Sequence, residues 1–165
     1  FGRMWLVKDE AAVVGKLGIE PFCAEFTPQF LKNMLKGRQT PIKSLLLNQT
    51  LIAGIGNMYA DEALHHAGLH PLRSAGSLNK VEISALHEAI LHVLQKGIRG
   101  KGASTDTYFR PSGNKGAAHL EFQVAHRKDE ECPICRNPIQ RITVQQRGTF
   151  FCPHCQPNRV SPCRD

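Results

Sequence analysis

Four of the six cysteines are spaced as the ligands of a metal ion would be. They form two pairs, each with two residues between its members, and 16 residues lie between the pairs: Cys132 with Cys135, then Cys152 with Cys155. A two-residue gap lets one turn direct both thiolates at one point, and zinc takes four such ligands in a tetrahedron at about 2.3 Å. The sequence therefore predicts one structural zinc ion.

Two disulfide bonds in a secreted domain are the alternative explanation of this spacing. Nothing in the sequence suggests export, because the first residues carry neither a long apolar run nor a small-residue cleavage site. Cys23 and Cys163 lie outside the pattern and are expected to be an inert buried thiol and a tail thiol. His154 lies within the second pair, but four sulfurs already complete a zinc site.

The segment between the cysteine pairs alternates as the two strands of a β-hairpin do. Glycine permits a tight turn, so we expect the hairpin to reverse at Arg147 and Gly148, with the arginine at its tip. The chain has 21 Lys and Arg against 14 Asp and Glu, a formal charge of +7, and residues 136–164 hold five arginines and no acid. This distribution favours a polyanionic partner, the alternative being a merely soluble basic protein.

A second candidate site is the turn Gly54-Ile55-Gly56-Asn57. It follows no strand and lacks the third glycine of a dinucleotide-binding loop, so it is expected to join two helices. Glycines let the backbone approach a partner closely, and a helix that starts at Asn57 directs free N–H groups and a positive dipole outward. The turn is either a phosphate site or a tight helix connection.

Helix-start signals divide the first hundred residues into a series of helices. Thr27-Pro28 and Thr40-Pro41 each pair a capping residue with proline at the first helical position. Residues 79–97 begin as a capping box and continue as an apolar stripe at helical spacing up to Gly97. Residues 101–116 are rich in Gly, Ser, Thr and Pro, which predicts a loop. No apolar run approaches the roughly 18 to 20 residues of a membrane span.

The segment PIKSLLLNQTLIAGIGNMYADEAL, the helix after it and the four-cysteine finger resemble the C-terminal half of bacterial formamidopyrimidine-DNA glycosylases. The resemblance spans nearly the whole chain. It implies a mainly α fold, with a helix-two-turn-helix bundle followed by a small β-hairpin zinc finger. The expected domains are the end of a truncated β domain (1–7), a helical DNA-binding domain (8–125) with a lesion-covering loop (101–120), and the finger (126–165).

The same resemblance implies roles for single residues. Lys43, the glycine-turn Asn57 and the finger Arg147 match residues that hold phosphates flanking the lesion, with Gly54 and Gly56 shaping the turn. Two further residues match positions at the lesion. Glu62 matches an acidic residue at the active centre, although a first-turn helix carboxylate explains it nearly as well. Phe1 matches an aromatic wedged into the base stack. None of the phosphate contacts reads a base, so they are expected to position a lesion without choosing it.

This chain departs from the family in two respects. The family's nucleophile is an N-terminal proline followed by a glutamate, and neither is present. Residues 116–119 and 125–126 also differ from those of many relatives, which carry aromatics in the loop and a tyrosine and glycine after it. The chain is therefore expected to bind damaged DNA without catalysing, the catalytic N-terminal domain being absent.

The resulting hypothesis is the DNA-binding half of a DNA glycosylase/AP lyase for oxidised purines such as 8-oxoguanine, in a bacterial protein that acts as a monomer in the cytoplasm, on the chromosome. Two alternatives stay open. One is the endonuclease-VIII-like branch, which acts on oxidised pyrimidines; the length of the loop at residues 103–120 favours the purine branch. The other is a non-catalytic nucleic-acid module with a zinc finger.

Overall fold

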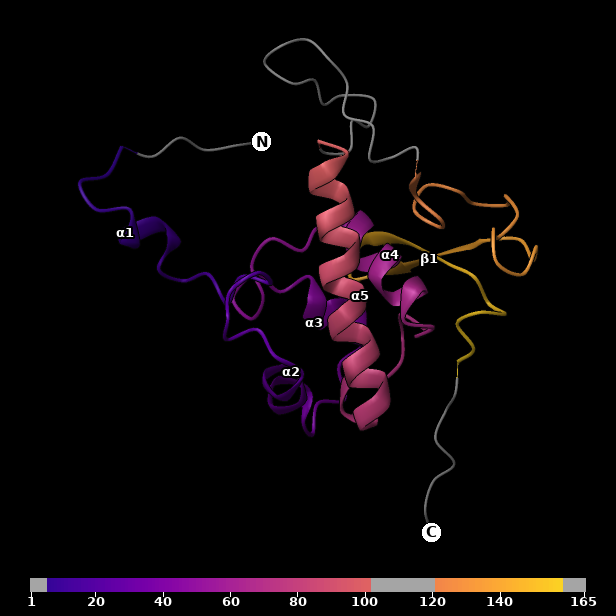
Figure 1. Ribbon diagram of the computed structural model, residues 1–165, viewed down its shortest axis with the longest axis horizontal. Helices are drawn as coiled ribbons and strands as arrows, with labels where there is room; N and C mark the ends of the chain where they lie inside the picture. The colour runs from indigo at the N-terminus through magenta and orange to yellow at the C-terminus, as the bar shows by residue number, and fades with distance from the viewer. Residues whose placement is uncertain (1–5, 102–120, 159–165) are drawn as a thin grey trace.

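The computed structural model describes residues 6–101 and 121–158, and its elements fall into a helical module and a small hairpin module (Figure 1). Of the expected strand end at residues 1–7, only residues 6 and 7 are described. Phe1 and Cys163 lie outside the described residues, and so does the 101–120 loop apart from Lys101. The elements, in chain order, are α1 (Ala11–Val14), α2 (Pro28–Leu35), α3 (Ile42–Leu46), α4 (Asn57–His66), a 3-10 turn (Ala75–Ser77), α5 (Lys80–Arg99), β1 (Gln140–Val144) and β2 (Arg147–Phe151).

The helix starts follow the predicted capping chemistry with one exception. Thr27 caps α2, its hydroxyl accepting a hydrogen bond from the Phe30 amide at 3.1 Å. At α3 the N-cap position is Pro41 and no side chain caps the helix, so the predicted role of Thr40 is wrong. The turn Gly54–Gly56 leads into α4 with Gly54 at φ +85°, a conformation that glycine adopts without steric cost.

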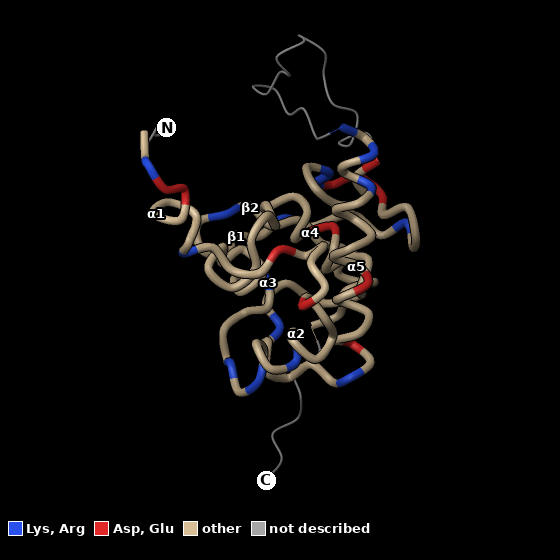
Figure 2. Tube along the Cα trace, turned by 60° about the vertical axis from the view of Figure 1, so that its left-hand side comes forward, with Lys and Arg blue, Asp and Glu red and all other residues tan. Residues whose placement is uncertain are grey.

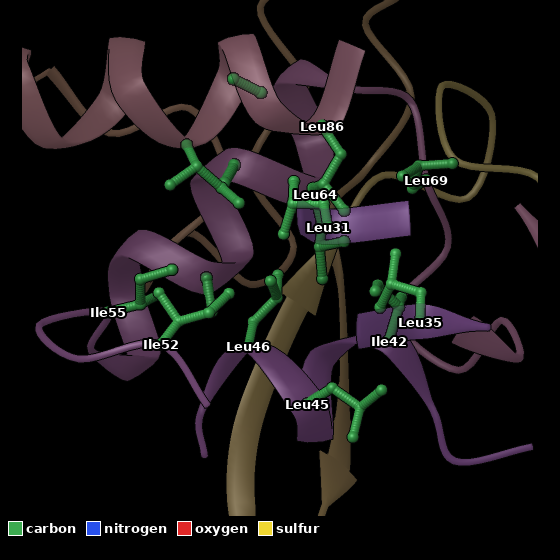
Figure 3. Packing of buried hydrophobic residues seen from close by; sticks show 14 of the residues in the cluster. Leu31, Leu35, Ile42, Leu45, Leu46, Ile52, Ile55, Leu64, Leu69 and Leu86 are labelled. Carbon is green, nitrogen blue, oxygen red and sulfur yellow. The ribbon is translucent and has the colours of Figure 1, made fainter. Parts of the chain in front are cut away.

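The long helix α5 forms one wall of the helical core. It begins with the complete capping box predicted from Asn79 and Glu82, and it runs two residues past Gly97. The Tyr59 ring of α4 packs against Gly97 and leaves no space for a Cβ, so close packing rather than helix termination explains this glycine. Figure 3 shows Leu31 of α2, Leu64 of α4 and Leu86 of α5 close together. They belong to a buried hydrophobic cluster that also includes Ile55 of the turn before α4, and this cluster holds the helices together.

The finger is a two-stranded antiparallel hairpin between the two cysteine pairs. Val144 pairs with Arg147, so the turn consists of Gln145 and Gln146, both with positive φ (47° and 60°). This corrects the predicted turn at Arg147 and Gly148: two consecutive left-handed residues reverse the chain with the twist that a hairpin needs. Arg147 is the first residue of β2, beside the turn rather than at its tip.

The two modules pack against each other through α4 and β2. This arrangement of helices followed by a hairpin agrees with the predicted helix-two-turn-helix and finger. Figure 2 shows basic and acidic residues interspersed along the described trace, so net charge alone marks no single binding face. Within residues 6–101 and 121–158, no helix is long and apolar enough to cross a membrane.

Candidate metal centre and nucleic-acid interface

The four paired cysteines converge on one point, as predicted from their spacing. Their sulfur atoms all lie within 4.8 Å of one another: Cys132, Cys135, Cys152 and Cys155. Two measured separations, 3.9 Å for Cys132–Cys155 and 3.4 Å for Cys135–Cys152, bracket the edge of about 3.8 Å expected of a tetrahedron with zinc–sulfur bonds of about 2.3 Å. They far exceed a disulfide bond of about 2.05 Å, so the disulfide alternative is excluded for these pairs.

The surroundings of Cys135 favour its thiolate, the form that binds zinc, whereas burial raises the pKa of the Cys152 and Cys155 thiols. The Cys155 amide donates to the Cys152 sulfur at 3.4 Å, and the Asn137 side chain donates to the Cys135 sulfur at 3.5 Å. The Asn137 backbone N–H is the main cause that lowers the pKa of the Cys135 thiol to about 6. The convergence of the four sulfurs and the match to a zinc-finger family identify zinc as the structural ion of this finger.

A buried ion pair within the helical module makes hydrogen bonds to the hairpin. The Lys43 ammonium lies 2.6 Å from the Asp61 carboxylate, and neither side chain is exposed. The same ammonium donates to the Thr149 hydroxyl at 2.8 Å and to the Gly148 carbonyl at 3.2 Å, which engages all three of its protons. Asp61 also accepts the Phe150 amide at 3.1 Å. Residues of α3 and α4 therefore hold the backbone of β2.

Burial dominates the electrostatics of this pair. It raises the pKa of Asp61 to about 6, although Lys43 and the Phe150 amide favour the carboxylate. Burial also lowers the pKa of Lys43, against the attraction of Asp61. Such a pair contributes little net stability but costs several kcal/mol when one partner is removed, because the other charge is left unpaired. Lys43 thus fixes the position of β2, and its ammonium has no proton left for a phosphate in this arrangement.

The glycine turn and the start of β2 lie side by side. The Asn57 side-chain amide donates to the Gly148 carbonyl at 2.9 Å, which joins the first residue of α4 to the residue after Arg147. Gly54, Gly56 and Arg147 are exposed at this junction, and no side chain caps the N-terminus of α4. The structure thereby brings four of the predicted DNA-binding residues together, with exposed backbone, a helix dipole and one arginine on the same edge.

Glu62 is buried and does not belong to the first turn of α4. The residue is 6% exposed, and its carboxylate accepts hydrogen bonds from the backbone amides of Gln123, Val124 and Ala125 at 2.9 to 3.0 Å. The interpretation as a solvated first-turn carboxylate is therefore wrong. A carboxylate that accepts several N–H groups is well stabilised. Glu62 anchors the chain where the described residues resume after the 102–120 segment.

Two family profiles match the two modules. The profile described as the formamidopyrimidine-DNA glycosylase H2TH domain covers residues 17–108, and the zinc finger found in FPG and IleRS covers residues 129–158. The chain belongs to the formamidopyrimidine-DNA glycosylase family. The resemblance predicted from the glycine turn and the cysteine pairs is thus confirmed, and H2TH names the helix-two-turn-helix module below.

Curated formamidopyrimidine-DNA glycosylases are close in sequence. The chain is 49% identical to that of Symbiobacterium thermophilum over 144 residues, which are 87% of this chain and 47% of the relative. It is 46% identical to that of Chloroflexus aurantiacus over 164 residues, which are 98% of this chain and 59% of the relative. The chain thus spans about half the length of the curated relatives that it matches.

Solved structures of the family share the fold. The crystal structure of the MutM (Fpg) protein from Thermus thermophilus matches with a TM-score of 0.86 at 37% identity, over 92% of this chain and 59% of that one. The Lactococcus lactis enzyme, bound non-covalently to DNA containing an AP site, matches with a TM-score of 0.77 at 39% identity, over 86% and 51% of the two chains.

Several residues that build this site in a member of the formamidopyrimidine-DNA glycosylase family were not predicted from the sequence. Gln49 fixes the glycine turn by accepting the Gly54 amide at 2.9 Å and donating to the Ile55 carbonyl at 2.9 Å. Gln156 joins the modules by accepting the Cys152 amide and donating to the Leu69 carbonyl. Asp61 lies next to Glu62 in the sequence. Its negative charge was the only feature of the sequence that could have indicated an ion pair with Lys43.

Proposed function

We propose that this chain is the DNA-binding half of a base-excision-repair DNA glycosylase/AP lyase that acts on oxidised purines in double-stranded DNA. The observation that carries the proposal is the hydrogen bond from Asn57 to the Gly148 carbonyl, because it sets the H2TH turn and the finger arginine on one edge. A double helix presents regularly spaced phosphates, and two positively polarised groups at a fixed distance match such a target.

Each residue of this edge has a separate role in the proposal. The exposed backbone at Gly54 and Gly56 and the start of α4 supply N–H donors to one phosphate, and Arg147 supplies charge and a forked donor to another. The Asn57 amide nitrogen keeps a second proton after donating to Gly148, so it is able to donate to a phosphate as well. Lys43 acts through the hairpin, because its ammonium is buried.

Zinc supplies the folding energy of the finger and thereby fixes the starting point of β2. Glu62 keeps the chain at residues 123–125 close to α4, and we place it at the edge of the active centre as a positioning group. The amine nucleophile belongs to the N-terminal domain of such an enzyme, so the 165 residues alone are expected to bind DNA without cleaving it. The roles of Phe1 and the 101–120 loop at the lesion also remain part of this proposal.

Oxidised purines are the preferred substrate class in this proposal because structures of related proteins contain such lesions. The Lactococcus lactis relative is known in complex with DNA containing Fapy-dG, and a MutM in complex with carbocyclic 8-oxo-G. A second candidate is supported by a complex of the Lactococcus lactis protein with DNA containing an oxidised pyrimidine. As a bacterial repair protein, the whole molecule would act as a monomer on the chromosome in the cytoplasm.

A competition binding assay tests this proposal. The zinc-loaded chain is titrated at fixed salt against matched duplexes with and without an abasic-site analogue. Binding that weakens steeply with salt supports a phosphate-binding edge, and a preference for the damaged duplex places part of lesion recognition in this half. Absence of duplex binding at low salt would contradict the proposal.

Borohydride trapping on an 8-oxoguanine duplex tests the division of labour. The proposal predicts no covalent adduct with these 165 residues, since the amine nucleophile lies elsewhere. A trapped adduct would place a nucleophile within this chain and overturn that part of the proposal.

A further inference from the structure

A histidine of the helical module reaches one of the four sulfurs of the finger. The Nε2 atom of His65, on α4, lies 3.6 Å from the Cys132 sulfur, a distance within the range of an N–H···S hydrogen bond. Both side chains are buried, His65 to 2% exposure and Cys132 to 0%. Water therefore does not compete for this contact, and the histidine comes from outside the zinc finger itself.

The donor in this contact follows from the chemistry of the site. A thiolate bound to zinc has no proton and only accepts hydrogen bonds, so Nε2 must carry the proton. A neutral imidazole with its proton on Nε2 leaves Nδ1 as an acceptor.

Two of the other three sulfurs obtain their donors from within the finger. Cys152 accepts from the Cys155 amide and Cys135 from the Asn137 side chain, and both donors belong to the finger. Cys132 instead accepts from α4 of the helical module. Groups that donate to metal ligands typically change metal affinity about 10- to 100-fold, because they stabilise the negative charge of the ligand.

We propose that His65 is a positioning residue of the zinc site, its Nε2–H stabilising the Cys132 thiolate across the boundary between the modules. Zinc retention in this chain then depends on docking of the finger against α4, and zinc release and undocking are coupled. This inference goes beyond the proposed DNA-binding function and does not depend on it, since its tests involve no DNA.

The first test measures zinc transfer from the loaded chain to an excess of a chromogenic chelator. His65→Phe keeps an aromatic ring but loses the donor, and zinc transfer should become about 10- to 100-fold faster. His65→Gln places an N–H donor near the position of Nε2 and should restore most of the retention. An unchanged rate in His65→Phe would overturn the proposal, as would equal rates in the Phe and Gln variants.

His70→Phe is the matched control. His70 is also a buried histidine near the finger, where its ring contacts Phe151, and within the described part of the chain no hydrogen bond joins it to a cysteine sulfur. Its replacement should leave zinc transfer within about threefold of the original rate. Acceleration as large as that of His65→Phe would show that general loosening of the interface explains the effect, and would overturn the proposal.

Two spectroscopic measurements read the hydrogen bond directly. In the chain loaded with cadmium-113 in place of zinc, the cadmium resonance should shift in His65→Phe and stay in place in His70→Phe. Long-range nitrogen–proton correlation spectra of the unsubstituted zinc-loaded chain should show the His65 proton on Nε2, and this measurement requires no variant to fold. A proton on Nδ1 instead, or an unmoved cadmium resonance in His65→Phe, would contradict the proposal.

Discussion

The helical module and the finger are stabilised in opposite ways. The helical module has 19 buried hydrophobic residues in one cluster drawn from α2 to α5. The corresponding cluster of the finger contains four buried residues, and two of them, Cys132 and Cys152, are zinc ligands. A core of that size cannot offset the entropy of ordering about 30 residues, so the metal must supply the difference.

The interface between the modules differs from both, because buried polar contacts make up much of it. The buried Lys43–Asp61 pair and the Asn57, Gln156 and Glu62 side chains make hydrogen bonds across it. Directional contacts fix a relative orientation more sharply than apolar packing does, at a small net gain in stability. The comparison indicates that the finger is folded by zinc, whereas its orientation is set by the helical module.

Zinc removal should produce the largest effect and affect one module alone. Cys135→Ala, or chelation of the loaded chain, is expected to unfold the hairpin while α5 stays helical, because apparent zinc binding energies of about 10 kcal/mol or more far exceed the stability of so small a core. Amide spectra of residues 140–151 and zinc content check this. Cys23→Ala, at a cysteine outside the site, is the control; unchanged zinc content in Cys135→Ala would contradict the account.

Lys43→Met should give the next largest effect, on the interface. The Asp61 carboxylate is then buried without its cation, and we expect a loss of about 3 to 5 kcal/mol in the free energy of unfolding. Urea unfolding measures it. Lys96→Met, which breaks the exposed pair with Glu121, is the matched control and should cost less than about 1 kcal/mol. Similar losses in the two variants would show that the buried pair does not hold the hairpin.

Leu86→Ala tests the apolar core in the same way. Leu86 is completely buried on α5, and truncating such a residue costs about 2 to 5 kcal/mol through lost transfer energy and the remaining cavity. The loss should appear in the thermal unfolding of the helices with zinc content unchanged. Release of zinc in the folded variant would contradict the separate origin of stability in the two modules.

Arg147→Ala should weaken DNA binding without a comparable loss of stability, because the side chain is exposed. Removing one charged phosphate contact is expected to cost about 1.5 kcal/mol, roughly tenfold in affinity for damaged and undamaged duplexes alike, and to lower the salt slope by about one. Lys128→Ala removes an exposed charge of the finger outside the hairpin and serves as control. A loss confined to damaged DNA would mean that Arg147 reads the lesion.

The pH dependence of stability tests the buried ion pair through its acidic member, Asp61. Burial raises the pKa of Asp61 in the folded state to about 6, above its ordinary value of 3.8. The folded state therefore holds this proton at a pH where the unfolded chain has lost it, and the stability that Asp61 contributes decreases by about 2 kcal/mol as the pH rises from about 4 to 6.

The free energy of unfolding is measured for the original chain and for Asp61→Asn across this pH range. The difference between the two chains should become smaller as the pH rises. Asp129→Asn is the control, because Asp129 is largely exposed. A difference that instead grows as the pH rises would show that the Asp61 pKa is lowered in the folded state.

The sequence was most informative where local chemistry decides the structure. Cysteine spacing, the Asn79 capping box and the Thr27 cap depend on contacts within a few residues, and the structure confirms them. The hairpin was predicted but its turn was placed two residues late, because Gly148 is a stronger turn signal than the Gln145–Gln146 pair that forms the turn.

The interface could not be predicted in the same way. Lys43 and Asp61 are 18 residues apart, and Thr149 is a further 88 residues along the chain, so only the tertiary fold brings them together. A lysine in the predicted binding set was expected to meet a phosphate, whereas its ammonium is buried against β2. Lysines are rarely buried unless paired, and sequence alone does not reveal the partner.

The central claim is that the H2TH turn and the finger form a single phosphate-binding edge. The most direct test is titration of the zinc-loaded, nitrogen-15-labelled chain with a short abasic duplex, followed by amide spectra. The account predicts that the amides of residues 54–58 and 147–148 shift together, with one common dissociation constant. Shifts confined to one module, or two separate constants for the two sets of amides, would contradict it.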